Sequence, residues 1–233
     1  EDGNDYAEGG SGGDIINAGA GDDVAFGGAG DDKLRGGDGD DQLHGGEGGD
    51  VIHGGKGDDA VYGGEGDDKL FGGDGNDKLS GGAGNDHIEG GAGDDKLDGG
   101  ADDDKLLGGS GDDVILGGAG ADRLVGGSGS DTIEGGAGDD HMWGGNWWKD
   151  GSTDTFVVSA GGGKDMIHDF ETGHDQIDLS SYGLEFSDLQ SLMTNQGWAT
   201  EIDLSGLDGG QTGDKILIKS IDPDDLDESN FIL

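Results

Sequence analysis

The stretch Gly27-Gly28-Ala29-Gly30-Asp31-Asp32-Lys33-Leu34-Arg35 decides the fold, because its pattern recurs every nine residues. Counted from Gly9, fifteen such units follow one another without a gap and end at Trp143. The second position of each unit is Gly; the first is Gly except at Ala18, and the fourth is Gly except at Asp102. A fixed period of this length predicts a solenoid, in which each unit repeats one small structural element against its neighbours.

Two further positions of the unit keep their chemical character in every copy. The sixth position is Asp in all fifteen units, at Asp14, Asp23, Asp32, Asp41, Asp50, Asp59, Asp68, Asp77, Asp86, Asp95, Asp104, Asp113, Asp122, Asp131 and Asp140. The eighth position is always apolar, at Ile16, Ala25, Leu34, Leu43, Ile52, Val61, Leu70, Leu79, Ile88, Leu97, Leu106, Ile115, Leu124, Ile133 and Met142. A structureless acidic linker would not keep this spacing through fifteen copies, so the repeats indicate a folded state.

The composition of the chain leaves that folded state without its usual sources of stability. Only 29% of the 233 residues are hydrophobic, 59 are Gly and none is Cys, so disulfides cannot hold the fold. The formal charge is −42, and repulsion on that scale opposes compaction and disfavours a nucleic-acid partner. No apolar run is long enough to span a membrane. These features predict a chain that folds around cations.

The repeat supplies the oxygen ligands that such a cation needs. Ca²⁺ binds six to eight hard oxygen atoms, and Gly-rich backbone can turn its carbonyl groups towards an ion. We therefore predict that the sixth-position Asp residues and the fourth-position glycines bind calcium; the glycines are Gly12, Gly21, Gly30, Gly39, Gly48, Gly57, Gly66, Gly75, Gly84, Gly93, Gly111, Gly120, Gly129 and Gly138. The buried apolar residue of each unit contributes about 1.5–3 kcal/mol. Ordering nine residues costs on the order of 10 kcal/mol, so metal has to supply the difference.

The pattern G-G-x-G-x-D-x-U-x resembles the repeats-in-toxin (RTX) nonapeptide, over residues 9–143 and with partial units on both sides. The resemblance implies an all-β fold, a right-handed parallel β-roll (β-solenoid) of stacked nonapeptide pairs. In that family a six-residue loop of each unit binds calcium and the other three residues form a strand. Ions between loops i and i+2 would give about 13 sites (15 − 2), with a few more in the flanking units.

Residues 144–233 are expected to close the roll as a second unit behind the calcium-binding residues 1–143. Strands are expected within residues 154–158, 163–170, 173–180, 202–204 and 215–218. The first three resemble the degenerate closing turns that follow RTX repeats, and Asp165 and Asp175 are predicted as further metal ligands. A capping box at Ser187-Asp188-Leu189-Gln190 predicts a short helix that ends near Asn195. A cap of this kind covers the last turn of an open repeat array.

The last seven residues, Asp227-Glu228-Ser229-Asn230-Phe231-Ile232-Leu233, resemble the uncleaved C-terminal signal of type I secretion substrates. The resemblance implies a secreted or cell-surface bacterial protein, expected to be a monomer, with the type I secretion machinery as its partner during export. The chain opens at Glu1 in the middle of a repeat, so the natural protein is expected to extend further towards its N-terminus.

Other motifs were weighed against these interpretations. Gly9-Gly10-Ser11-Gly12-Gly13 matches a hydrolase nucleophile elbow, but Ser11 is a repeat position without a catalytic context, and the chain is not expected to be an enzyme. His44 and His53 end consecutive units and are expected on opposite sheets, as solvated residues rather than metal ligands.

The outward ninth positions near the end of the repeats are apolar, at Leu107, Val125 and Trp143. Such a ladder needs a cover, for which the C-terminal flank is the preferred candidate, or a binding partner. Trp143, Trp147 and Trp148 could form a sugar-stacking platform, but a cap is the commoner role of such a cluster. The sequence therefore predicts a calcium-dependent folding and secretion module; the alternative is a carbohydrate- or cell-surface-binding adhesin module.

Overall fold

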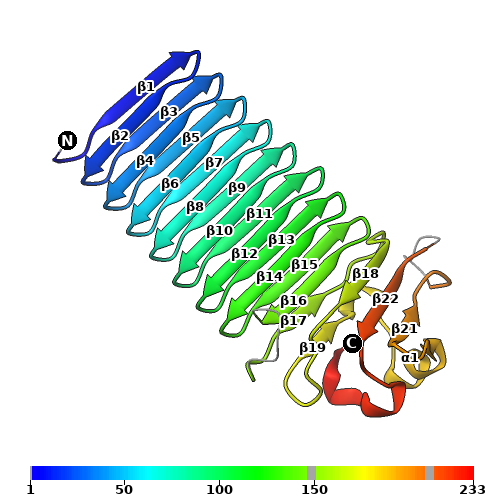
Figure 1. The fold of residues 1–233 in the computed structure, drawn as a ribbon. Helices are drawn as coiled ribbons and strands as arrows, with labels where there is room; N and C mark the ends of the chain where they lie inside the picture. The colour runs from blue at the N-terminus through cyan, green and yellow to red at the C-terminus, as the bar shows by residue number, and fades with distance from the viewer. Residues whose placement is uncertain (1, 146–150, 208–212) are drawn as a thin grey trace.

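The computed structural model describes residues 2–145, 151–207 and 213–233, and its repeats wind into a flattened solenoid of two parallel sheets (Figure 1). Successive strands alternate between the sheets. One has the order β1-β3-β5-β7-β9-β11-β13-β15-β17-β19-β23, and the other β2-β4-β6-β8-β10-β12-β14-β16-β18-β22-β21-β20. The repeat strands are β1 Tyr6–Ser11, β2 Ile15–Ala20, β3 Val24–Ala29, β4 Lys33–Asp38, β5 Gln42–Glu47, β6 Val51–Lys56, β7 Ala60–Glu65, β8 Lys69–Asp74, β9 Lys78–Ala83, β10 His87–Ala92, β11 Lys96–Ala101, β12 Lys105–Ser110, β13 Val114–Ala119, β14 Arg123–Ser128, β15 Thr132–Ala137 and β16 His141–Gly145.

Each turn of the solenoid contains two nonapeptide units, so residues 18 apart in sequence pair in register. In the sheet of β4, β6 and β8, Leu34 pairs with Ile52 and Ile52 pairs with Leu70. Every strand pair within the repeats is parallel, because the chain always returns to a sheet after the same 18 residues. The predicted parallel β-roll is confirmed.

The repeat strands are longer than the three residues that the family resemblance implies. They span six residues, as in β4, from the seventh position of one unit to the third of the next. Backbone pairing continues through the glycines, as between Gly28 and Gly46, and the amide of Gly30 still donates to the carbonyl of Glu47. The expectation of three-residue strands is therefore wrong, because Gly-rich backbone needs no side-chain contact to extend the hydrogen-bond ladder.

The core lies between the two sheets and consists mainly of the eighth-position side chains. From Ala25 to Met142 all of them are buried, whereas Ile16, near the open N-terminal end, is half-buried. Within a strand such as β6 the inward positions are the eighth and the following first, which is Gly. One large side chain per strand thus fills the interior, as the sequence predicts.

The region after the repeats continues both sheets and then covers their end. Strands β17 Thr155–Val157, β18 Lys164–Ile167 and β19 Gln176–Asp178 confirm the three predicted closing strands. The remaining elements are η1 Ser180–Tyr182, α1 Phe186–Leu192, β20 Met193–Asn195, β21 Ala199–Asp203, β22 Lys215–Lys219, η2 Pro223–Asp225, η3 Glu228–Asn230 and β23 Phe231–Ile232. Strand β22 is parallel to β18 but antiparallel to β21, so the regular winding ends there.

The predicted start and end of the helix are wrong. Ser187 lies inside α1, and Glu185 occupies the N-cap without a side-chain hydrogen bond. Packing sets these limits, since the ring of Phe186 lies 5.9 Å from that of Phe231 and Leu189 is buried. The helix ends at Leu192 because Met193 already pairs with Ile202 of β21. Within the described residues no helix has the length and apolar character to cross a membrane.

The outward apolar ladder near the end of the repeats forms as predicted. Leu107 pairs with Val125, and Val125 pairs with Trp143. The flank supplies part of the cover, because the ring of His168, just after β18, stacks on the indole of Trp143 at 3.9 Å between centroids. Trp147 and Trp148, the other two members of the proposed cluster, lie outside the described residues.

Candidate metal centres

The sixth-position Asp residues form two rows, each running along one edge of the roll where the chain passes from one sheet to the other. Within a row, each backbone amide donates to Oδ1 of the Asp 18 residues later, as from Asp23 to Asp41 at 2.8 Å and from Asp50 to Asp68 at 2.7 Å. The side chains are buried from Asp23 to Asp140, while Asp14 is half-buried at the N-terminal end. The rows bring every predicted Asp ligand to the loop edges.

The second carboxylate oxygen of each of these residues is buried without a hydrogen-bond partner. Among the described residues, Oδ2 of all fifteen, from Asp14 to Asp140, is shielded from solvent and receives no donor. A buried carboxylate oxygen without a donor or a cation is costly, so such atoms are rare in proteins. Fifteen of them in regular rows indicate places for a positively charged ligand.

Backbone carbonyl oxygens lie beside these carboxylate oxygens. A Cβ placed on Gly9 would lie 2.7 Å from Oδ2 of Asp14 and 2.7 Å from the carbonyl oxygen of Gly27. The same pairing recurs at Gly45, where the neighbours are Oδ2 of Asp50 and the carbonyl oxygen of Gly63. The Asp carboxylate of one unit and a backbone carbonyl from two units later therefore border the same space. The Gly at the first position of the unit keeps that space open because it has no side chain.

This donor set fits calcium. It consists of hard oxygen atoms, one charged and the others neutral, which is the combination that Ca²⁺ selects over softer metals. Nowhere in the described residues do three His, Cys, Asp or Glu side chains converge on one point. The oxygen atoms that an ion would meet along the rows are single carboxylates together with backbone carbonyls.

The fourth-position glycines, predicted as carbonyl ligands, lie in the turns that precede each sixth-position Asp. Gly48 has φ +118°, and a Cβ on it would lie 2.6 Å from the carbonyl oxygen of Gly30 in the turn below. The carbonyls of successive turns thus lie one above another along each edge. Asp102 takes the same conformation with φ 77°, one of two non-Gly residues with positive φ in the described chain, so its turn keeps the shape of the others.

Burial changes the acidity of the Asp rows. In the middle of the roll the pKa of Asp59, Asp68 and Asp95 is raised to about 7, mainly by desolvation and to a smaller extent by the charges of neighbouring Asp residues. Each carboxylate also accepts a hydrogen bond from a backbone amide, which lowers its pKa but does not cancel the rise. A rise of this size means that the ionised rows need counter-charge at neutral pH.

Both rows continue beyond the repeats. The amide of Asp140 donates to Oδ1 of Asp165, and the amide of Asp154 donates to Oδ1 of Asp175, so both predicted flank ligands lie in the rows. Asp154 itself, which accepts from Asp131, was not predicted as a ligand. Asp154 and Phe156 have the same Asp-x-apolar spacing as the repeats, and that spacing could have identified Asp154 as a member of the row.

Two other carboxylates of the flank bind backbone amides. Asp169 accepts from Gly144 and Gly145, where the last repeat strand ends, and burial raises the pKa of Asp169 to about 6. Asp214 accepts from Gly161 and Gly163 and is itself buried. Neither residue follows the nonapeptide spacing, so the sequence gives no signal for these contacts.

The two His residues weighed as transition-metal ligands lie on opposite sheets, as expected. They are not simply solvated: the ring of His44 stacks between Phe26 and Tyr62 at 4.7 Å from each, and His53 stacks on Phe71 at 4.6 Å. The 18-residue register brings outward aromatic residues into contact, and this contact replaces solvent. Ser11 lies exposed at the end of β1.

Comparison with known proteins identifies the repeats. A family model described as the RTX calcium-binding nonapeptide repeat (4 copies) matches overlapping segments that together span residues 1–146. No curated protein matches the chain in sequence. Among solved structures, the AlgE6R3 subunit of the Azotobacter vinelandii mannuronan C5-epimerase is 29% identical, with 57% of this chain and 78% of that subunit covered and a TM-score of 0.43. The extracellular lipase LipA of Serratia marcescens is 18% identical, with 90% of this chain covered, 40% of the lipase covered and a TM-score of 0.45.

Proposed function

The chain belongs to the RTX calcium-binding nonapeptide-repeat family, and from that premise we propose that it is a calcium-dependent folding and secretion module of a larger extracellular bacterial protein. The observation that carries the proposal is the pair of rows of buried carboxylates whose Oδ2 atoms have no donor in the described structure. Calcium supplies the missing positive charge, so metal binding and folding become one equilibrium.

The residues that hold the ions are, in this proposal, the sixth-position Asp residues with backbone carbonyls of adjacent turns. The ligands also include Asp165 and Asp175, and Asp154 joins them by its place in the same row. About 13 or more ions would cancel on the order of 26 of the charges in a chain whose formal charge is −42. Residues 1–143 then form the metal-built unit and residues 144–233 the cap that carries the export signal.

The biological use of such a module follows from where calcium is scarce and where it is abundant. At low calcium inside the cell, repulsion among the acidic rows keeps the chain unfolded and able to pass a narrow export channel. Outside, millimolar calcium folds it, beginning at the capped C-terminal end. The module performs no catalysis of its own in this proposal, and the activity of the whole protein resides in other parts.

An export assay tests this function. The chain is produced in a bacterium with a type I exporter, as it is and without residues 227–233, and the protein in the medium is measured. The full chain is expected in the medium and the shortened chain in the cytosol. Because the deletion also removes β23 and Phe231 from the cap, circular dichroism of the purified shortened chain measures how far its repeats still fold in calcium. Equal export of the two chains would refute the assignment of the secretion signal, and absence of export for both would refute the secretion role.

A further inference from the structure

A hollow of about 370 Å³ lies in the cap, lined by residues in or beside β20, β21, β22 and η2. Because β21 and β22 are antiparallel, Trp198, just before β21, lies beside Ser220, just after β22, and the amide of Ser220 donates to the carbonyl oxygen of Trp198 at 2.9 Å. Among the described residues that line the hollow, none belongs to the Asp rows. Small-molecule sites typically have volumes of about 300–1,000 Å³, so the hollow has the size of a separate ligand site.

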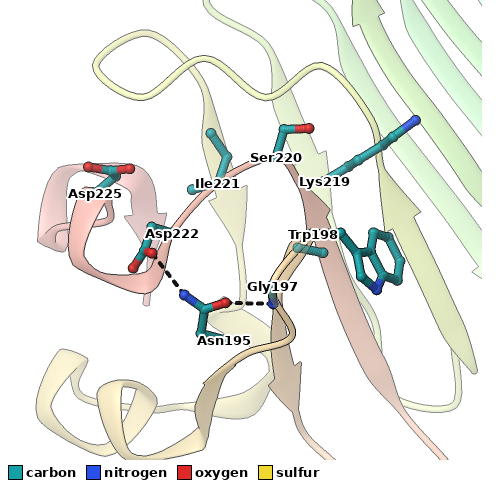
Figure 2. A pocket seen from close by; sticks show the side chains of 9 residues that line it. Asn195, Gly197, Trp198, Lys219, Ser220, Ile221, Asp222 and Asp225 are labelled. Carbon is teal, nitrogen blue, oxygen red and sulfur yellow. Dashed lines mark hydrogen bonds between the residues drawn. The ribbon is translucent and has the colours of Figure 1, made fainter.

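Hydrogen bonds and a constrained backbone hold the hollow in shape. Nδ2 of Asn195 donates to Oδ2 of Asp222 at 2.8 Å, and Oδ1 of Asn195 accepts from the amide of Gly197 at 2.6 Å (Figure 2). Ser220 has φ 62°, a conformation that costs energy in a residue other than Gly and that concentrates at binding sites. The hollow is therefore preformed, and a ligand need not order it.

The hollow has an aromatic and basic side and an acidic side. Figure 2 shows Trp198 and Lys219 on one side and Asp222 and Asp225 on the other. Trp198 is 51% exposed, and Lys219 and Asp225 are also exposed. Within the described residues Lys219 forms no ion pair, and the carboxylate of Asp225 accepts no hydrogen bond. The indole, the ammonium group and this carboxylate are thus free to contact a ligand.

These groups are complementary to a ligand that carries both charges. An exposed indole attracts organic cations, and aromatic side chains recognise quaternary ammonium groups in particular. A calcium ion would use only the carboxylates of Asp222 and Asp225, because it binds hard oxygen atoms and gains nothing from Trp198. An organic ammonium group contacts both sides of the hollow. Lys219 then pairs with an anionic group of the same ligand, since a Lys ammonium binds phosphate as a point charge.

We propose that the hollow binds a small zwitterion of the phosphocholine class. Its trimethylammonium group lies between the indole of Trp198 and the carboxylates of Asp222 and Asp225, and its phosphate lies beside Lys219. The formal charge of −42 disfavours a simple anion, and a simple cation leaves Lys219 without a partner. The site uses neither the Asp rows nor the export signal, so this proposal and the proposed function can fail separately.

The experiment measures the binding of three dissolved probes to the full chain in calcium. Glycerophosphocholine carries both charges, choline carries only the cation, and dimethyl phosphate carries only the anion. Proton NMR follows the methyl resonance of each probe during titration with the protein. The variants are Trp198→Leu, Asp225→Asn and Lys219→Met. Asp224→Asn is the matched control, because Asp224 is exposed and adjacent to Asp225 but does not line the hollow.

Glycerophosphocholine is expected to bind most tightly, choline more weakly, and dimethyl phosphate not at all. Trp198→Leu and Asp225→Asn should each weaken glycerophosphocholine binding by about fivefold or more, and Asp224→Asn by less than about twofold. Lys219→Met should weaken the binding of glycerophosphocholine but leave that of choline within about twofold, a difference that loss of the fold would not produce. Circular dichroism verifies folding in calcium, and the exposed position of Asp225 keeps the test valid if Trp198→Leu disturbs the cap.

The proposal is overturned if glycerophosphocholine does not bind, if Asp224→Asn and Asp225→Asn weaken its binding equally, or if dimethyl phosphate binds as tightly as the zwitterion. Once the dissolved zwitterion is shown to bind, co-sedimentation with phosphatidylcholine vesicles distinguishes its source. Vesicle binding that Trp198→Leu abolishes assigns the site to a lipid headgroup, and the absence of vesicle binding assigns it to the free compound.

Discussion

At the scale of single residues, the fifth and sixth positions of the repeat are adjacent yet serve different purposes. The fifth position is exposed. Where it is Asp or Asn, its side chain accepts a hydrogen bond from the backbone amide of the fifth position in the next turn, as Asp67 does from Asn85. An amide oxygen performs this role equally well, since Asn76 accepts from Asp94 at 2.8 Å. The sixth position is always Asp, and its second oxygen is buried without a donor; in the proposed function this oxygen carries the charge that faces an ion.

Asp68→Asn and Asp67→Asn therefore differ in their predicted effects. Asp68→Asn removes the charge of one predicted ligand in the middle of the roll and should lower the free energy of unfolding in calcium by about 2 kcal/mol. Asp67→Asn should leave the calcium midpoint within about twofold of the original, because the amide keeps the hydrogen bond. Calcium titration followed by circular dichroism measures both; equal midpoints for the two variants would contradict the assignment of the sixth position.

The second-position glycines are fixed by backbone conformation and by space. Gly46 has φ +118°, and a Cβ there would overlap the carbonyl oxygen of Gly28. Gly46→Ala should therefore destabilise the calcium-bound state by about 1–3 kcal/mol. Glu47→Ala is the matched control, because the third position is exposed and Ala29 already occupies it in another unit. Thermal unfolding in calcium distinguishes them, and a neutral Gly46→Ala would show that the turn can relax.

At the scale of strands and helices, the repeats were predictable and the cap only in part. Residues such as Leu34 and Ile52 occupy equivalent environments, so the 18-residue period alone fixes their register and burial. In the cap each contact is unique: Phe186 packs on Phe231, 45 residues away, and this packing overrides the local capping signal at Ser187. The length of the repeat strands was missed because hydrogen bonds continue through glycines that carry no hydrophobic pattern.

The candidate site could be predicted from the sequence because the repeats place equivalent residues at a fixed period. A constant Asp at a constant position, from Asp14 to Asp140, is visible without a structure, whereas the roles of Asp169 and Asp214 depend on segments brought together by folding.

The cap is expected to support the folding of the repeats. It extends both sheets and covers the last turn, where Phe156, Ile167 and Ile177 continue the two interior ladders. Truncation after Trp143 should raise the calcium concentration needed for folding and broaden the transition. Deletion of residues 45–62, one complete turn of 18 residues, shortens the roll but keeps the cap, and should change the midpoint much less. Identical transitions for the truncated and the full chain would refute the capping role.

At the scale of the whole molecule, the burial of so many carboxylates makes stability depend on pH when calcium is chelated. Folding raises the pKa of Asp59, Asp68 and Asp95 from about 3.8 to about 7. The folded state then binds more protons than the unfolded state, so the stabilisation is complete below about pH 4 and lost as the pH rises through about 7. In buffer from which calcium has been removed with a chelating resin, strand content should increase as the pH is lowered from 8 to 5. A chelated chain with the same spectrum at both pH values would contradict this.

The central claim is that calcium, rather than the thin aliphatic core, holds the roll together. Its most direct test is far-UV circular dichroism at pH 8 during a titration from EGTA into millimolar calcium, with magnesium in a parallel titration. The predicted result is an unfolded spectrum in EGTA, a cooperative gain of strand signal at millimolar calcium, and no comparable gain with magnesium. A complete strand spectrum in EGTA, unchanged when calcium is added, would contradict the claim.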